Sequence, residues 1–91
     1  MKIIVRVFGD ISQIIGRRHE LELPEGVTVS TVTAKVGEKS GQRQGYLGEF
    51  RVGGKDLAIL VNGKSIDMID GTQTKLKDGD EVVVMQPTAG G

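Results

Sequence analysis

The amino-acid sequence predicts an α+β domain with one mixed sheet packed against one main helix. Residues 2–8 alternate between apolar and other side chains with the period of two that a half-buried strand requires. Residues 28–36 instead place valines at the spacing of one helix face, and residues 81–86 form another apolar strand near the end of the sequence. Strands and helices in this order favour a sheet with the main helix across one face.

The composition restricts the classes of function. Ninety-one residues suffice for one small core, with no room for a second one. Twelve lysines and arginines balance twelve aspartates and glutamates, so the basic excess that attracts nucleic acid or an anionic membrane is missing. No apolar run approaches the roughly 18 residues of a membrane span. The absence of cysteine excludes disulfides, thiol nucleophiles and cysteine-held metals. Residues 1–8 have an arginine inside their apolar stretch and no small-residue cleavage site, which is typical of a strand rather than a signal peptide, so we expect a cytoplasmic protein. We expect neither a nucleic-acid nor a membrane partner.

A short helix and a second strand are expected after residues 2–8. Asp10 is a candidate N-cap for the helix, and Gly16 should end it. Its expected apolar stripe is Ile11, Ile14 and Ile15. Residues 19–23 alternate again, and because the chain reverses within about eight residues, this strand should pair with the first.

The main helix is predicted to follow Thr28 as its N-cap. The positions expected to face the sheet are Val29, Val32 and Val36. Residues 37–56 are rich in glycine without a clear period, which predicts a surface excursion with a small local cluster. The bulky apolar residues of that cluster are Tyr46, Leu47 and Phe50.

A hairpin and the last strand complete the predicted sheet. Residues 57–61 are a continuous apolar run, Asn62-Gly63 is a strong signal for a tight turn, and residues 64–66 begin the return strand. Residues 81–86 form the last strand, which we expect beside the first.

Three motifs that suggest ligand chemistry have simpler structural explanations. Gly63-Lys64-Ser65 matches the end of a phosphate-binding loop, but Ala58 stands where the pattern needs its first glycine, and the context is a hairpin. Asp78-Gly79-Asp80 lacks the alternating ligands of a calcium loop and is typical of a tight turn. His19 is the sole histidine, so a multi-histidine metal site is excluded. We expect no bound metal.

Apolar side chains are also expected on the sheet face that the helix does not cover. Period-two alternation places Ile4 and Phe8 of the first strand there, together with Val83 and Met85 of the last. An exposed apolar patch of this kind favours a docking surface. The alternative is that Tyr46, Leu47 or Phe50 folds over the patch and buries it.

The sequence after the last strand predicts a thin, flexible tail over residues 87–91, following a single domain over residues 1–86. Pro87 should stiffen the root of the tail, while Gly90 and Gly91 have no Cβ and could enter a narrow pocket. This ending suggests that the reacting group is the carboxylate of Gly91.

Taken in order, these segments resemble the MoaD/ThiS family of ubiquitin-like sulfur carriers, most closely the small subunit of molybdopterin synthase and its archaeal relatives. The resemblance covers nearly the whole chain except about residues 37–56. The segments that carry it are Ile14-Ile15-Gly16, residues 24–29, Val61-Asn62-Gly63, residues 76–82 and Ala89-Gly90-Gly91.

The resemblance implies a β-grasp fold and a carrier that is not catalytic on its own and binds no cofactor stably. An activating enzyme of the ubiquitin-activating type would adenylate Gly91 with ATP and magnesium, and a sulfur donor would convert the adenylate to a thiocarboxylate. The tail residues Pro87, Ala89 and Gly90 would then enter a pocket of the molybdopterin synthase large subunit. Phe8 and Met85 fall where family members make apolar contacts with that subunit.

Two departures from the family pattern leave other functions open. Gln86 replaces the first of two prolines that bacterial synthase subunits usually carry, and the glycine-rich excursion resembles archaeal members. Some of those are protein modifiers that form isopeptide bonds with lysine, or supply sulfur for transfer-RNA thiolation. The hypotheses are therefore a sulfur carrier, a ubiquitin-like modifier, and a β-grasp interaction module with an inert tail.

Overall fold

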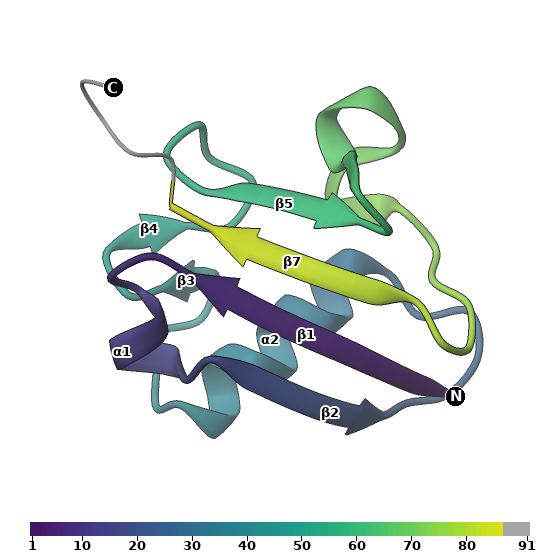
Figure 1. Ribbon diagram of the computed structural model, residues 1–91, viewed down its shortest axis with the longest axis horizontal. Helices are drawn as coiled ribbons and strands as arrows, with labels where there is room; N and C mark the ends of the chain where they lie inside the picture. The colour runs from purple at the N-terminus through teal and green to yellow at the C-terminus, as the bar shows by residue number, and fades with distance from the viewer. Residues whose placement is uncertain (87–91) are drawn as a thin grey trace.

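A five-stranded mixed sheet with one long helix across one face forms the body of the protein (Figure 1). The computed structural model describes residues 1–86. Spatially, the strands of the main sheet follow the order β2-β1-β7-β5-β6. Their bounds are β1 (Lys2–Phe8), β2 (Arg18–Glu22), β5 (Ala58–Val61), β6 (Lys64–Ser65) and β7 (Glu81–Met85). The other elements are α1 (Ser12–Ile15), α2 (Val29–Lys39), β3 (Tyr46–Leu47), β4 (Phe50–Arg51), and the 3₁₀ helices η1 (Ile66–Met68) and η2 (Gly71–Gln73).

The two predicted strand pairings are confirmed. β1 pairs with β2 in antiparallel fashion and with β7 in parallel fashion, so the first and last strands are neighbours at the centre of the sheet. The register places Val5 opposite Val82 and Phe8 opposite Met85. This is the ubiquitin-like β-grasp arrangement that the sequence resemblance implies.

The core lies between the sheet and α2. Alternate residues of β1, β7 and β5 point into it, and α2 contributes one face of valines, as the helical spacing predicts. The central members of this core are Ile3, Val5, Val7, Val29, Val32, Val36, Ile59, Val82 and Val84. The other side chains of the sheet strands face away from α2, on the side turned to the viewer in Figure 1. We call that side the open face.

Both segments that suggested nucleotide or calcium binding form tight turns, and the carboxylates of Asp78 and Asp80 accept hydrogen bonds there. Asn62 and Gly63 both have positive φ, 50° and 86°, as a two-residue hairpin turn requires. The Asn62 amide donates to Asp80 Oδ1 at 2.9 Å and its Oδ1 accepts from the Glu81 N–H at 2.9 Å, while Asp78 Oδ1 accepts from the Lys2 N–H at 2.6 Å. These side chains fix the starts of β1 and β7.

The short helix differs from its prediction at its start. Asp10 is not the N-cap; Ile11 holds that position, and no side chain caps the helix. The Ser12 hydroxyl and N–H both donate to the Gly9 carbonyl, so the turn begins before Asp10 can reach a free N–H. Ile11 and Ile15 are buried, whereas Ile14 is 54% exposed because one turn of helix can bury only one narrow face.

The stretch 37–56 is more integrated than a surface excursion with its own cluster. Residues 37–39 extend α2, and β3 and β4 form a small hairpin. Leu47 is fully buried in the main core, and Phe50 and Val52 pack against that core. The expected local cluster is therefore part of the single core, because Leu47 of β3 is buried next to Gly37 of α2 and Phe50 of β4 packs against the same core.

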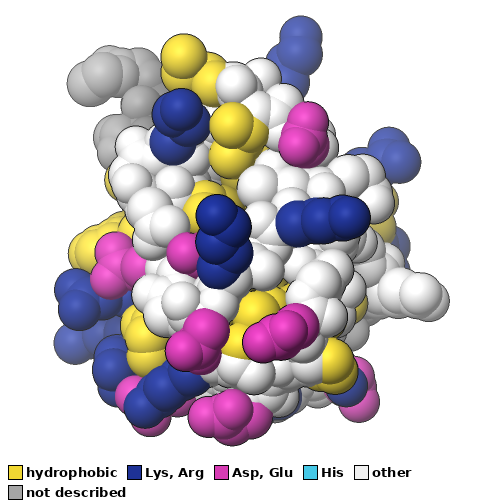
Figure 2. Space-filling model, turned by 90° about the vertical axis from the view of Figure 1, so that its right-hand side faces the viewer, with side chains coloured by type: hydrophobic (Ala, Val, Ile, Leu, Met, Phe, Trp, Pro, Cys, Tyr) yellow, Lys and Arg dark blue, Asp and Glu magenta, His cyan; other side chains and the backbone are white. Residues whose placement is uncertain are grey.

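Charged side chains of both signs are mixed over the surface that Figure 2 shows, the end at which β1 begins. No large field of one sign covers that end. Among residues 1–86, no helix is long and apolar enough to cross a membrane.

Candidate docking surface

The open face carries the apolar side chains that alternation places there. Phe8 is 50% exposed and Met85 is 37% exposed, and they lie directly opposite each other on β1 and β7. Ile4 and Val83 are partly exposed on the same face. A parallel pair in this register brings two large apolar side chains together at the point where β7 ends.

Two further residues extend this surface, and the sequence analysis missed them. Ala58 lies opposite Met85, and Leu60 lies opposite Val83, both on the antiparallel neighbour β5. Both are partly exposed. Residues 57–61 are all apolar, so alternation does not show which side chains point to the open face. Only the register of β5 against β7 shows it. We name Ile4, Phe8, Ala58, Leu60, Val83 and Met85 the apolar patch.

The stretch 37–56 does not cover this patch. Leu47 packs into the core on the α2 side of the sheet, and Figure 1 draws β3 and β4 behind the sheet, opposite the open face. Burial of Phe8 and Met85 by Tyr46, Leu47 or Phe50 is therefore not what the structure shows. That a partner binds Phe8 and Met85 remains a prediction.

The end of β7 leads into the predicted tail beside the turn that follows β1. A Cβ added to Gly9 would lie 3.5 Å from Cβ of Gln86, so Gln86 and this turn are close neighbours. Pro87, Ala89, Gly90 and Gly91 lie outside the described residues. Their predicted roles in partner binding and as the reacting group are untested by the structure.

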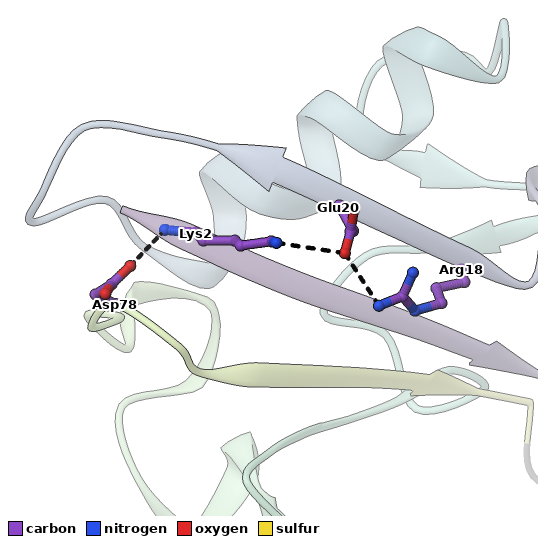
Figure 3. A network of polar contacts seen from close by, with 4 residues as sticks. All are labelled: Lys2, Arg18, Glu20 and Asp78. Atoms are coloured by element: carbon purple, nitrogen blue, oxygen red, sulfur yellow. Dashed lines mark hydrogen bonds and ion pairs between the residues drawn. The ribbon is translucent and has the colours of Figure 1, made fainter.

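A small charged network lies on the open face at the β2 edge (Figure 3). Glu20 accepts from Arg18 at 3.1 Å and pairs with Lys2 Nζ at 3.5 Å, while the Lys2 backbone N–H donates to Asp78. The Lys2 ammonium, and then the Arg18 guanidinium, hold the pKa of the Glu20 carboxyl below its ordinary value. All of these groups are exposed, so the network favours the β1–β2 pairing only weakly.

His19 has a structural role at the end of α1. Its Nε2 lies 2.6 Å from the carbonyl oxygen of Ile15, which also accepts from the Ser40 hydroxyl at 3.2 Å. These bonds satisfy the end of α1 and tie it to the end of α2. Within residues 1–86, no group of three or more metal-binding side chains is present.

The sequence matches one known protein family over nearly its whole length. The family model described as "ThiS family" matches residues 5–91, which is almost the whole sequence and includes the final glycines. The chain belongs to the ThiS family.

Two similar proteins carry names that describe a function. The chain is 35% identical to a candidate sulfur carrier protein of Archaeoglobus fulgidus over 63 residues, which cover 69% of this chain and 65% of that protein. The match therefore spans slightly less than two thirds of that relative. This chain is also 28% identical to small archaeal modifier protein 3 of Haloferax volcanii over the full length of both chains. The chain thus belongs to a family of ubiquitin-like sulfur carriers and modifiers.

Solved structures give the same fold. A candidate molybdopterin converting factor subunit 1 from Pyrococcus furiosus is 30% identical, with a TM-score of 0.75 over 97% of this chain and 99% of that one. A chain from the complex of subunits 1 and 2 of the Helicobacter pylori molybdopterin-converting factor is 28% identical, with a TM-score of 0.64 and full coverage of both chains. Small archaeal modifier protein 1 of Haloferax volcanii is 19% identical with a TM-score of 0.78 and full coverage of both chains, which shows the fold alone.

Proposed function

We propose that this ThiS-family protein is a sulfur carrier that acts as the small subunit of molybdopterin synthase. Its working group is the carboxylate of Gly91, which an adenylating enzyme activates and a sulfur donor converts to a thiocarboxylate. The catalytic groups belong to its partners. The chain itself supplies a reactive end and a surface on which those partners dock.

One observation carries this proposal: an exposed apolar patch lies where the chain leaves the sheet toward its glycines. Phe8 and Met85 are paired at the end of β7, and the family match continues from there through Gly91. A partner that holds the patch would therefore hold the root of residues 87–91 at a fixed place. The similar Helicobacter pylori chain comes from a complex of two converting-factor subunits, which supports a role in which this fold binds a partner subunit.

The chemistry explains why activation is needed. A carboxylate is a poor electrophile, because its negative charge repels nucleophiles and an oxide is a poor leaving group. Attack of the Gly91 carboxylate on the α-phosphate of ATP forms an acyl-adenylate and releases pyrophosphate. A sulfur nucleophile then adds to the carbonyl carbon and AMP departs, which leaves sulfur bound to the terminal carbonyl. Magnesium and ATP are substrates of the activating enzyme in this scheme.

A second function is favoured by one specific relative. The full-length match to small archaeal modifier protein 3 supports a ubiquitin-like modifier. In that route a lysine amine attacks the carbonyl carbon of the same acyl-adenylate, AMP departs, and an isopeptide bond forms. Sulfur supply for transfer-RNA thiolation uses the same thiocarboxylate. The three routes share activation of Gly91 and differ in the group that receives the acyl carbon or the sulfur.

Intact mass spectrometry of the protein from its native cells tests the proposal. We expect a population heavier by the replacement of one oxygen with sulfur, mapped by fragmentation to Gly91. Deletion of Gly90-Gly91 should abolish this species and molybdopterin synthesis in the same cells. A variant with one alanine appended after Gly91 is a second test, because it keeps both glycines but moves the terminal carboxylate off Gly91. It should also lose the modification at Gly91.

The outcomes separate the candidate functions. A ladder of larger conjugates on a reducing denaturing immunoblot, lost on deletion of the two glycines, would favour the modifier. If neither sulfur nor conjugates appear, and the deletion leaves cofactor synthesis and thiolation intact, the proposal is wrong.

A further inference from the structure

A second feature lies beside the apolar patch, at the β2 side of Phe8. It is a shallow, open groove of about 450 Å³ between the end of β1, the start of β2 and the turn that leads into α1. Three arginines line it, Arg6, Arg17 and Arg18, together with Phe8 and Ser12. No acidic side chain is among the lining residues.

The strand register concentrates this positive charge. Arg6 and Arg18 are directly opposite each other on β1 and β2, and both point to the open face. Like charges at opposed positions of an antiparallel pair are unfavourable. Each is offset by one carboxylate lying away from the groove, Glu81 at 3.1 Å from Arg6 and Glu20 at 3.1 Å from Arg18.

Arg17 differs from its neighbours in this respect. Within residues 1–86 it forms no ion pair, whereas its backbone carbonyl accepts from the Val7 N–H at 2.9 Å and so fixes its place beside β1. Arg17 is exposed and is one of the residues that line the groove. The groove thus presents one uncompensated cation next to two partly compensated ones.

We propose that this groove binds the carboxylates of an acidic segment from a partner protein that docks on the apolar patch. This rests on the proposed function only in taking the open face as a docking surface. Phe8 belongs to both the groove and the patch, so one partner segment with acidic and apolar side chains can occupy both. A guanidinium group can donate two parallel hydrogen bonds to the two oxygens of one carboxylate.

The charge balance decides between a protein segment and a nucleic acid. Three arginines less the two carboxylates paired with them leave a net charge of about +1 at the groove. A nucleic-acid backbone needs several uncompensated cations along its path, and the whole chain has a net charge of zero. A short segment with one or two carboxylates beside apolar residues fits this surface better.

Nuclear magnetic resonance titration of the full chain tests the proposal. The probe is a capped hexapeptide that alternates leucine and glutamate, and its control has glutamine in place of glutamate. We expect the glutamate peptide to shift backbone amides of residues 6–9 and 17–18, with an affinity at least tenfold higher than that of the glutamine peptide. Arg17→Glu should weaken binding at least tenfold, and because Arg17 has no carboxylate partner within the described part of the chain, it leaves none unpaired.

The control variant is Lys35→Glu, which makes the same change in net charge on the exposed side of α2, behind the sheet. It should leave the affinity within twofold. Equal binding of the two peptides, no shifts at 10 mM peptide, or an equal effect of both variants would overturn the proposal. Tighter binding of a hexameric RNA or of inorganic phosphate at the same amides would also overturn it. Because the titration needs no sulfur transfer, its result is independent of whether Gly91 becomes a thiocarboxylate.

Discussion

At the scale of single residues, Phe8 and Met85 link the sheet to the proposed function. Both are large and apolar, yet they leave half and more than a third of their surfaces in contact with solvent. Burying such side chains in a partner releases the water around them, and buried residues of this kind contribute most of the binding free energy of an interface. Their substitution should therefore affect binding more than folding.

Phe8→Asp is expected to weaken binding to a docking partner by about 30-fold or more, a loss of about 2 kcal/mol, since it removes apolar contact area and buries a charge. Calorimetry with the activating enzyme or the synthase large subunit measures the affinity. Ile14→Asp is the matched control, because Ile14 is similarly exposed at 54% but lies on α1. Loss of folding by Phe8→Asp, or an equal effect of Ile14→Asp, would contradict the docking role.

The sequence predicts one part of the patch and misses another for a physical reason. Alternation along residues 2–8 is local, so it places Ile4 and Phe8 on one face without any knowledge of the fold. Ala58 and Leu60 join them only through the register of β5 against β7, which depends on non-local pairing. Asp10 is not the N-cap because the hydroxyl and N–H of Ser12 donate to the carbonyl of Gly9, and the helix starts after Ile11. Local sequence patterns do not show where a one-turn helix starts.

At the scale of elements, exposed ion pairs add a small stabilisation to the backbone hydrogen bonds that pair β1 with β2. Glu20 of β2 pairs with Lys2 of β1 and with Arg18 of its own strand. Because these cations lower the pKa of Glu20, the folded state holds its proton less tightly than the unfolded chain does. The resulting stabilisation is present above the unfolded-state pKa and disappears as the pH falls through the folded-state pKa.

Glu20→Gln should therefore lower the melting temperature slightly at pH 7, and the difference from the native sequence should vanish as the pH falls through the lowered folded-state pKa of Glu20. Thermal unfolding followed by circular dichroism across this range measures it. Glu22→Gln is the control, since Glu22 lies on the same strand but makes no ion pair among residues 1–86. A difference that grows toward acid pH would have the wrong sign for this explanation. Added salt should reduce the effect at pH 7.

The element predictions succeed where the pattern is long or the turn chemistry is strong. α2 is correctly placed by three valines at helical spacing, and the β5–β6 hairpin by Asn62-Gly63. The hairpin of β3 and β4 is not predicted, since two-residue strands show no alternation. Its glycine-rich sequence resembles that of a loop, and only the burial of Leu47 shows that it belongs to the core.

At the scale of the whole molecule, one core spans the sheet, α2 and the β3–β4 hairpin. Leu47 has no exposed surface and a Cβ added to Gly37 of α2 would lie 3.4 Å from its Cδ2, so helix and hairpin are in close contact. Residues 37–56 should therefore unfold together with the rest of the domain. Their small size gives them no independent core.

Leu47→Ala is expected to lower the free energy of unfolding by about 2–5 kcal/mol, because it leaves a cavity in the core. Tyr46 is the single tyrosine and tryptophan is absent, so its fluorescence reports on the hairpin while far-ultraviolet circular dichroism reports on the sheet and α2. The two transitions in denaturant should coincide in both proteins. Leu60→Ala, on the partly exposed open face, should cost less. If Leu47→Ala shifted the Tyr46 fluorescence transition to lower denaturant and left the circular dichroism transition unchanged, the hairpin would be a separate folding unit.

The parallel pairing of β1 with β7 has a mechanical consequence. The chain enters the sheet at the beginning of β1 and leaves it at the end of β7, and these two strands run side by side in the same direction. A pull that separates the two ends of the domain therefore loads all the hydrogen bonds between them at once, in shear. Hydrogen bonds loaded together in this way resist force better than bonds opened one after another. A force applied between the start of β1 and the residues beyond β7 is therefore opposed by all of these hydrogen bonds together.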